Sequence, residues 1–365
     1  MKNIVLVFGT RPEAVKMCPL VLELKKRKNI SVSVIVTGQH REMLSSVLSS
    51  FGVEPDIDLD IMSEGQTLFD IHEKVLRGMR AILEKEKYDL LLVHGDTTTA
   101  FAASLAAFYM GVPVAHVEAG LRTYDINAPY PEEFNRVAVD AVSRLHFAPT
   151  QLSADRLISE GKKAENIFVT GNTVIDALAY TVRDDFSHPI LDFAKGKRMV
   201  LFTAHRRENI GENMQQMFDA VKDVLLTHPD VCAIYPVHPN PAVRAAAQSA
   251  FENFPQVMLT EPLDVFDFHN IMARSHLVLS DSGGLQEEAP AFGVPVLVMR
   301  ETTERPEGVE AGTVCLAGNT YDSVKTAFSS LLDDKDLYKR MAKAKNPYGD
   351  GTACKQIADI IENNI

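Results

Sequence analysis

A glycine-containing turn late in the chain has the composition of a phosphate-binding site. Residues 280–299 have the sequence SDSGGLQEEAPAFGVPVLVM and follow the apolar run His276-Leu-Val-Leu. This order predicts a βαβ unit whose turn is formed by Ser282, Gly283 and Gly284. Free N–H groups and the dipole at the start of the expected helix attract phosphate. Because no Lys follows the glycines, the turn is not the P-loop of ATP- or GTP-binding proteins.

An acidic residue follows this turn on the same face of the expected helix. Glu288 lies four residues beyond Gly284, so both residues lie on one side of the helix. A carboxylate beside a phosphate site suits the hydroxyl groups of a ribose, as in dinucleotide-binding folds. The unit is therefore interpreted as a nucleoside-diphosphate site. The local pattern fits equally well a tight strand–helix turn that binds no ligand.

Two further acids stand directly after apolar runs. Asp96 ends the run that begins at Leu90, and Glu118 follows the run from Val112 to Val117. If both runs are parallel strands, their carboxyl ends share the rim that faces the ligand crevice of an open α/β sheet. Asp96 also fits a helix N-cap, whereas Glu118, followed by Ala-Gly, has no such role. Glu132 precedes a helix and is alternatively only an acid of its first turn.

Basic residues at other expected strand ends are placed to meet an anion. Arg11 and Lys16 flank the helix that follows the apolar run Ile4 to Phe8, and ordinary surface charge is the alternative. His205 follows the run Met199 to Thr203, and its alternative is a hydrogen bond at a helix start. The net charge is -12, so a phosphate site must supply its own positive groups.

These residues are positioned by a repeated alternation of strands and helices. The expected strands cover 4–8, 32–36, 90–96, 112–117, 146–148, 167–169, 199–203, 232–237, 257–260, 276–279 and 294–299. The expected helices include 68–87, 97–110, 212–226, 266–275, 285–292, 321–344 and 352–363. The same order in two halves predicts an α/β protein with two doubly wound domains that face one cleft. We place the passage between them near the polar stretch 183–198.

Composition excludes several classes of function. With 46% apolar and 24% charged residues the chain resembles an ordinary globular protein, and its negative charge argues against nucleic acid as a partner. Four scattered cysteines predict reduced thiols of a cytoplasmic protein and no zinc site. Neither a signal peptide nor a membrane-spanning run is expected. Asp56, Asp58 and Asp60 alternate with apolar residues, which favours an edge strand over a metal-binding D-x-D motif.

The chain resembles the non-hydrolysing UDP-N-acetylglucosamine 2-epimerases over nearly its whole length. The resemblance rests on motifs that occur in the family's order. They are Gly9-Thr-Arg-Pro-Glu13, Gly38-Gln-His-Arg-Glu42, His94-Gly-Asp-Thr-Thr-Thr99, His116-Val-Glu-Ala-Gly-Leu-Arg-Thr123, Pro131-Glu-Glu-Phe-Asn-Arg136, Thr203-Ala-His-Arg-Arg-Glu-Asn209, Asp281-Ser-Gly-Gly-Leu-Gln-Glu-Glu-Ala-Pro290 and Thr302-Thr-Glu-Arg-Pro-Glu307. Several of these motifs are weak alone, but together they are specific.

The resemblance implies a fold and an activity. The fold is the glycosyltransferase-B architecture, with Rossmann-like domains over 1–170 plus 350–365 and over 171–349, and a C-terminal helix that crosses back to the first domain. The activity is interconversion of UDP-GlcNAc and UDP-ManNAc, which supplies precursors for surface polysaccharide. The family usually forms homodimers and uses no metal and no nicotinamide cofactor. A UDP-sugar glycosyltransferase of the same architecture is the alternative function.

The resemblance also assigns residues to roles. The catalytic set comprises Asp96, Glu118, Glu132 and His205. The residues that contact the nucleotide sugar comprise Arg11, Lys16, Phe268, Ser282, Gly283, Gly284, Glu288 and Arg305. The expected reaction is anti-elimination of UDP to give 2-acetamidoglucal, followed by re-addition with a proton on the opposite face. One carboxylate acts as base and another group as acid, and clustered carboxylates are expected to raise one another's pKa.

A second, regulatory UDP-GlcNAc site is known in many bacterial members of this family. The residues that match it are Gln39 and His40. Two other positions differ from the pattern, because Glu42 stands where a Gln is expected and Gly65 where an Arg is expected. Both differences make the site less positive toward a diphosphate. We therefore expect activation by UDP-GlcNAc to be weak or absent in this chain.

Overall fold

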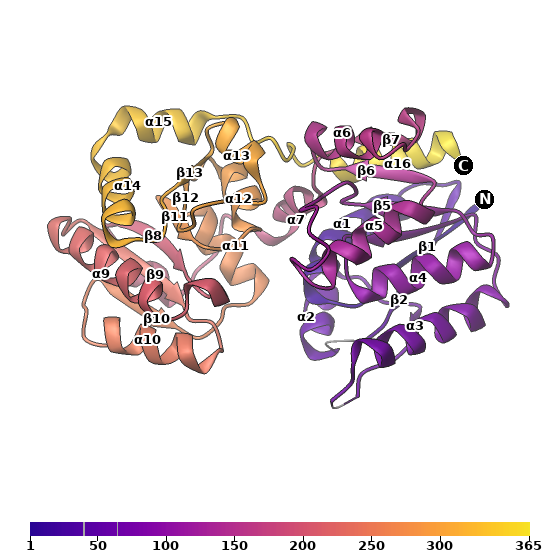
Figure 1. The fold of residues 1–365 in the computed structure, drawn as a ribbon, viewed down its shortest axis with the longest axis horizontal. Coiled ribbons are helices and arrows are strands. Elements are labelled where there is room, and N and C mark those ends of the chain that lie inside the picture. Colours follow the sequence, from indigo (N-terminus) through magenta and orange to yellow (C-terminus); the bar gives the residue numbers. More distant parts are fainter. Residues whose placement is uncertain (39–40, 64) are drawn as a thin grey trace. The chain divides into compact units, whose positions relative to one another are not determined.

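Two parallel sheets organise the chain, one in each of its two units (Figure 1). The computed structural model describes residues 1–38, 41–63 and 65–365. The first unit comprises Met1–Tyr180 and Tyr348–Ile365, and the second comprises Thr181–Pro347. The domain boundaries expected from the sequence stay a prediction.

The sheet of the first unit has seven parallel strands in the order β3-β2-β1-β4-β5-β6-β7. Its strands are β1 (Lys2–Phe8), β2 (Ile30–Val36), β3 (Ile57–Asp58), β4 (Leu90–His94), β5 (Val114–Val117), β6 (Leu145–Ala148) and β7 (Ile167–Val169). From β1 the chain adds β2 and β3 toward one edge of the sheet. From β4 it adds β5, β6 and β7 toward the other edge. The carboxyl ends of β1 and β4 therefore flank the switch point, where doubly wound sheets bind ligands.

The sheet of the second unit repeats this topology with six parallel strands in the order β10-β9-β8-β11-β12-β13. Its strands are β8 (Arg198–Thr203), β9 (Val231–Pro236), β10 (Val257–Thr260), β11 (Leu277–Ser280), β12 (Val296–Val298) and β13 (Val314–Leu316). Here the switch point lies between β8 and β11. The expected fold class, two doubly wound α/β units, is confirmed.

Helices connect consecutive strands in both units. In the first unit they are α1 (Arg11–Lys25), α2 (Arg41–Phe51), α3 (Leu68–Leu83), α4 (Thr98–Tyr109), α5 (Glu132–Val142), α6 (Gln151–Ser159), η1 (Ala164–Asn166), α7 (Thr173–Thr181) and α16 (Ala353–Asn364). In the second unit they are α8 (Pro189–Phe193), η2 (Arg207–Asn209), α9 (Glu212–Thr227), α10 (Pro241–Phe251), α11 (Val265–Ala273), α12 (Leu285–Glu288), η3 (Ala289–Phe292), α13 (Pro306–Glu310), α14 (Tyr321–Asp333) and α15 (Lys335–Lys343).

The central strands are apolar because helices cover both faces of each sheet. All five residues from Ile4 to Phe8 are 0% exposed, as are Leu90 to Val93. The edge is different, since β3 is short and Asp58 is exposed. Next to it, the carboxylate of Asp56 accepts the N–H of Val34 at 2.7 Å. The expected edge strand with its acids in water is confirmed.

The C-terminal helix α16 returns to the first unit, as expected. The guanidinium of Arg27 pairs with Asp359 at 2.7 Å and with Glu362 at 2.9 Å. The first turn of α16 is held by Asp176 of α7, whose carboxylate accepts the N–H groups of Ala353 and Cys354 at 3.2 and 2.9 Å. The helix therefore joins the first unit through both ends.

Two helices expected from the sequence are divided. The expected helix 321–344 is α14 followed by α15, because Asp334 leaves the helical conformation with φ -85° and ψ 94°. Its carboxylate accepts the N–H groups of Asp336 and Leu337, each at 2.9 Å, and so caps the second helix. The expected helix 285–292 is one short α-helix, α12, continued by the 3-10 turn η3.

The four cysteines are free, and Cys18, Cys232 and Cys354 are buried, as expected. Burial raises the pKa of Cys18 to about 12, so this thiol stays protonated. Across residues 1–38, 41–63 and 65–365, none of the helices combines the length and the apolar character that crossing a membrane requires.

Candidate active site

Three of the candidate acids belong to neighbouring elements of the first unit. Asp96 lies two residues after β4, Glu118 directly follows β5, and Glu132 is the first residue of α5. β4 and β5 are adjacent strands, so Asp96 and Glu118 share the carboxyl rim of the sheet. Glu118 has φ 66°, a left-handed conformation that is uncommon outside glycine. Such strain is typical of residues held in place for function.

The side chain of Glu118 is 8% exposed and is surrounded by donors. Its Oε2 atom accepts hydrogen bonds from the ammonium of Lys16 and, at 2.7 Å, from the amide of Asn172. Nε2 of His94 lies 3.4 Å from the same oxygen. Burial raises the pKa of Glu118, but the charges and hydrogen bonds of Lys16 and His94 outweigh burial and hold this pKa well below its usual range. The expected upward shift of the clustered acids is therefore wrong for Glu118.

Asp96 is held by an arginine and does not cap the helix that follows. The side chain of Thr97 accepts the N–H of Ala100 and is the N-cap of α4. The carboxylate of Asp96 accepts a hydrogen bond from Arg136, and its backbone carbonyl accepts the amide of Asn135 at 2.9 Å. Both partners belong to α5. The capping alternative for Asp96 is excluded.

Glu132 and Glu133 begin the same helix but differ in their partners. The carboxylate of Glu133 is 3% exposed and accepts the N–H groups of Thr123 and Tyr124 at 3.1 and 2.9 Å. By contrast, Oε2 of Glu132 is buried and has no hydrogen-bond partner among the described residues. A buried acceptor without a partner costs stability unless a ligand satisfies it. Glu133 thus stabilises the loop, whereas Glu132 keeps one carboxylate oxygen without a partner among the described residues.

The start of α1 is closed to a phosphate by its own glutamate. The carboxylate of Glu13 accepts the N–H groups of Gly9 and Thr10 at 3.0 and 2.8 Å and completes a capping box. The N–H groups of Gly9 and Thr10 are therefore already used. Arg11 is exposed beside this turn, and Lys16, one turn further along, is paired with Glu118.

In the second unit a buried aspartate fixes the loop after β8. Asp281 is 0% exposed, and its Oδ2 atom accepts the backbone N–H groups of His205 and Arg206, each at 2.9 Å, and the amide of Asn209 at 3.1 Å. The imidazole of His205 stacks on His238 with ring centroids 5.3 Å apart. Asp281 precedes the glycine turn directly, so it joins the loops after β8 and β11 at the switch point of this sheet.

The glycine turn is flanked by two guanidinium groups. A methyl group on Gly283 would lie 3.4 Å from Nη1 of Arg305 and 3.7 Å from Nη2 of Arg206. Arg305 is anchored by Glu287, and Nε of Arg206 donates to the carbonyl of Asp281 at 3.1 Å. Because α12 has only four residues, its dipole is a weak source of positive charge. The charge available at this turn comes mainly from the two arginines.

Glu288 lies beside Gly284, as its position four residues along the helix predicts. A methyl group on Gly284 would lie 3.3 Å from Oε1 of Glu288. The other oxygen of Glu288 lies 3.4 Å from Nε2 of His269, whose Nδ1 is 2.8 Å from the hydroxyl of Thr181. Phe268 neighbours His269 on α11 and is half-buried. The turn, Glu288 and Phe268 therefore belong to one region of the second unit.

The sequence did not identify several residues of these sites. Arg206 stands inside a quoted motif but nothing in the motif distinguishes it from its neighbours. His94, Asn172 and Arg136 contact the acids from distant parts of the chain. The candidate regulatory residues, Gln39 and His40, lie outside the described residues. Among those described, no group of three or more His, Cys, Asp or Glu is arranged to hold a metal ion.

Comparison with known proteins shows the family of this chain. Two doubly wound units and a C-terminal helix that returns to the first define an α/β protein of the glycosyltransferase-B type. The model of the UDP-N-acetylglucosamine 2-epimerase family matches residues 22–362, and the chain belongs to this family.

Known proteins of this family match the sequence over almost the full length of the chain. A UDP-N-acetylglucosamine 2-epimerase of Bacillus subtilis is 55% identical over 357 residues, 98% of this chain and 94% of the relative. One of Campylobacter jejuni is 48% identical over 373 residues, 99% of this chain and 97% of the relative. The crystal structure of UDP-GlcNAc 2-epimerase from Neisseria meningitidis bound to UDP-GlcNAc has a TM-score of 0.91 at 44% identity and covers 99% of this chain and 100% of that one.

Proposed function

We propose that this chain interconverts UDP-GlcNAc and UDP-ManNAc by inverting C2 of the sugar without hydrolysing the nucleotide sugar. A base takes the proton from C2, a double bond forms between C1 and C2, and UDP leaves C1 with the bonding electrons. UDP then returns to C1 of 2-acetamidoglucal while a proton reaches the opposite face of C2. The observation that carries the proposal is the cluster of Glu118, Lys16 and His94 at the sheet rim, in a chain of this family.

The acids of the first unit are assigned to proton transfer. Glu118 is assigned to accept the C2 proton, because it lies at the sheet rim and its lowered pKa keeps it ionised near neutral pH. The second face requires a group that donates a proton, and Asp96 and Glu132 are the candidates. Glu132 is favoured because one of its carboxylate oxygens is buried without a partner. Asp96, by contrast, is engaged by Arg136.

The second unit is assigned to the UDP group. Arg305 and Arg206 approach the glycine turn of Ser282, Gly283 and Gly284, and arginine pairs with phosphate through two hydrogen bonds. The departing diphosphate gains negative charge, which these guanidinium groups and His205 stabilise. Glu288 is assigned to the ribose hydroxyls and Phe268 to the uracil. Arg11 and Lys16 are assigned to the nucleotide sugar from the first unit.

One experiment tests the reaction as a whole. Enzyme and UDP-GlcNAc in heavy water are followed by proton NMR. We expect UDP-ManNAc to appear with deuterium at C2, because the proton that returns comes from solvent-exchanged groups. Release of free ManNAc would indicate the hydrolysing reaction instead, and release of UDP only when a sugar acceptor is added would indicate a glycosyltransferase.

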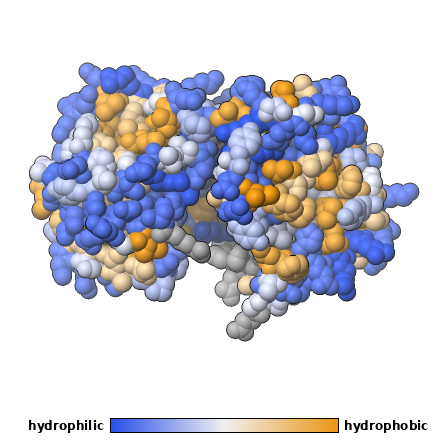
Figure 2. All heavy atoms as spheres, in the orientation of Figure 1, coloured by the Kyte–Doolittle hydropathy of each residue, from blue (hydrophilic) through white to orange (hydrophobic). Residues whose placement is uncertain are grey.

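As part of the same proposal, two copies of the chain form a homodimer through an apolar face of the first unit. Figure 2 shows hydrophobic residues gathered on the face that α4 and α5 form in Figure 1. Phe108 is 56% exposed, Tyr109 69% and Phe134 45%, and a groove of about 510 Å³ runs between α3 and α4. Large exposed apolar patches mark interaction surfaces. Replacing Phe108 and Tyr109 by Glu should convert a dimer to a monomer in light-scattering measurements.

We also place the protein in the cytoplasm. None of its four cysteines is in a disulfide, and three of them are buried. Reduced thiols of this kind are typical of cytoplasmic proteins. Fractionation of cells that express the protein, with detection by antibody, tests this part of the proposal.

A further inference from the structure

A buried histidine joins the helix of Glu132 to the loop of Asp96. His116 of β5 and Asp140 of α5 are each 0% exposed. Nδ1 of His116 lies 2.6 Å from Oδ1 of Asp140, and Nε2 of His116 lies 2.7 Å from the carbonyl oxygen of Gly95. Neither contact involves the substrate-facing groups themselves.

The two contacts fix the orientation of this imidazole between two acceptors. A carboxylate and a carbonyl are both hydrogen-bond acceptors, so each ring nitrogen of His116 must carry a hydrogen. Burial raises the pKa of Asp140, but His116, His146 and Arg122 outweigh burial and keep this pKa well below its usual range. His116 therefore faces an ionised carboxylate through Nδ1 and a carbonyl oxygen through Nε2.

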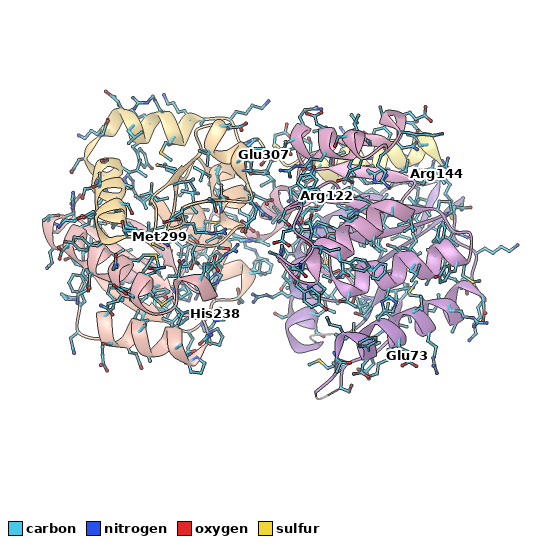
Figure 3. The ribbon with its side chains drawn as sticks, in the orientation of Figure 1. Glu73, Arg122, Arg144, His238, Met299 and Glu307 are labelled. Atoms are coloured by element: carbon cyan, nitrogen blue, oxygen red, sulfur yellow. The ribbon has the colours of Figure 1, made fainter. Side chains whose placement is uncertain are left out.

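Asp140 has further partners that stabilise its charge. Its Oδ2 atom accepts the guanidinium of Arg122 at 2.8 Å and the N–H of Gly120 at 3.3 Å. Figure 3 labels Arg122 among the side chains of the first unit. His146 approaches Oδ1 of Asp140 at 3.2 Å. The carboxylate of Asp140 thus keeps hydrogen-bond partners even when one of them is removed. Stabilising its charge does not require the contact between His116 and the carbonyl of Gly95.

The Gly95 carbonyl belongs to the peptide bond that Asp96 follows. Gly95 has φ 61° and its N–H donates to the carbonyl of Val117 at 2.9 Å. It lies between His94, which contacts Glu118, and Asp96. With His116 on its carbonyl, residue Gly95 is held through both its backbone N–H and its backbone carbonyl, which belong to the two peptide bonds that flank it. Asp96 directly follows this carbonyl, and its side chain contacts Arg136.

We propose that His116 is a positioning residue for the epimerisation, acting through its Nε2–H bond to Gly95, which fixes the peptide that carries Asp96. The inference rests on the proposed function of Asp96 in proton transfer. A misplacement of about 1 Å at a reacting group can cost on the order of 10²-fold in rate. His116 touches no substrate and is not itself an acid or a base in the reaction.

Two amide variants separate the two bonds of His116. The side-chain nitrogen of Asn is as many bonds from Cα as Nδ1 of His, and that of Gln is as many as Nε2. His116→Asn therefore keeps the donor to Asp140 and loses the donor to Gly95, whereas His116→Gln does the reverse. We expect His116→Asn to lower kcat by on the order of 10²-fold with UDP affinity unchanged, and His116→Gln to keep kcat close to that of the unchanged protein.

A matched control comes from the other histidine at Asp140. His146→Gln also removes a contact to Oδ1 of Asp140, but His146 has no contact with Gly95. We expect this variant to lose some thermal stability and to keep its kcat. Equal losses of kcat in both His116 variants, no loss in either, or a larger loss in His116→Gln would overturn the proposal.

The outcome also separates this inference from the proposed function. If the protein without substitutions does not epimerise UDP-GlcNAc, both proposals are overturned. If that protein is active and the His116→Asn variant is equally active, only the positioning role of His116 is overturned. If neither His116 variant folds, nitrogen NMR of the unchanged protein decides the question. Hydrogens on both ring nitrogens of His116 support the proposal, and a bare Nε2 contradicts it.

Discussion

Lys16 and Glu118 form an ion pair although they are 102 residues apart in the chain. The pair links the second turn of α1 to the residue after β5. Together with His94 it keeps the pKa of Glu118 well below its usual range, in spite of burial, which acts in the opposite direction. The pair therefore sets the protonation of the group that we assign as base.

Replacing Lys16 by Met should move the acidic limb of the kcat/KM profile to higher pH. The charge of Lys16 lowers the pKa of Glu118, so its removal raises this pKa. Since Glu118 must be ionised to accept a proton, the variant loses activity at a higher pH than the unchanged protein. Initial rates of UDP-ManNAc formation between pH 5 and 9 measure the effect.

The control for this variant is Lys26→Met. Lys26 caps the end of the same helix and pairs with Glu23 on the surface, with 62% of its side chain exposed. Removing it changes the net charge equally but leaves the surroundings of Glu118 intact. An identical profile for all three proteins would show that Lys16 does not control the base.

Glu132→Gln should nearly abolish turnover without unfolding the protein. One oxygen of Glu132, Oε2, is buried without a partner among the described residues, so the substitution removes no hydrogen bond from that oxygen. Loss of a proton-transfer group typically costs about 10²–10⁴-fold. The rate in heavy-water NMR and the melting temperature are measured together.

The adjacent Glu133→Gln is its matched control. Glu133 accepts two backbone N–H groups of the loop at 123–124. Weakening these bonds costs about 1.5–3 kcal/mol, so this variant should melt earlier while it retains turnover. If Glu132→Gln kept its rate, or if Glu133→Gln lost as much, Glu132 would not be a proton-transfer residue.

Arg206→Ala should weaken UDP binding, whereas Arg300→Ala should not. Both arginines pair with Glu304, Arg206 at 3.3 Å and Arg300 at 2.7 Å, so each variant removes one partner of the same acid. Only Arg206 also approaches Gly283, at 3.7 Å from the place of a methyl group. A charge-assisted hydrogen bond to phosphate contributes about 1.5–3 kcal/mol, about 10- to 100-fold in Kd. Calorimetric titration with UDP compares the two, and equal affinities would remove Arg206 from the site.

The strand-end acids could be predicted because parallel strands are apolar on both faces. Asp96 and Glu118 each interrupt such a run, and the alternation of strands and helices then places both at one rim. The turn of Gly283 and Gly284 could be predicted for the same reason. These features depend on residues that are close in sequence, and the pattern of apolar residues along the chain reveals them.

The partners of these groups could not be predicted, since they depend on contacts between distant segments. Asn172 reaches Glu118 from the end of β7, 54 residues away. Arg206 approaches the glycine turn because Asp281 holds its backbone N–H, and no local pattern shows this. The break at Asp334 was missed because apolar residues continue in both α14 and α15, although Asp is a good N-cap.

The second unit should lose stability in mild acid through His276. This imidazole stacks on Tyr338, with ring centroids 4.2 Å apart. Burial and the charge of Arg198 lower its pKa from 6.5 to about 4. Between these values the unfolded chain binds a proton that the folded chain does not, so stability present above pH 6.5 is lost as the pH falls toward 4. The expected loss from this group is about 1–2 kcal/mol between pH 7.5 and pH 5.

His276→Phe removes the titration and keeps an aromatic ring against Tyr338. Urea unfolding at pH 7.5 and pH 5 should therefore show a smaller acid-dependent loss in the variant than in the unchanged protein. The same loss in both proteins would show that His276 remains protonated or exposed in the folded state.

The last prediction is that this chain needs little or no activation by UDP-GlcNAc. Glu42 and Gly65 stand where the regulatory pattern has Gln and Arg, and each change disfavours a diphosphate by about 1 kcal/mol, or about fivefold in affinity. A reaction started from purified UDP-ManNAc alone should therefore show no lag. Glu42→Gln combined with Gly65→Arg should increase the response to added UDP-GlcNAc. Apart from its chain neighbours, no atom of the described residues lies within 4 Å of a methyl group added to Gly65, although its φ of 70° strains any side chain. An obligatory lag in the unchanged protein, abolished by a trace of UDP-GlcNAc, would contradict the prediction.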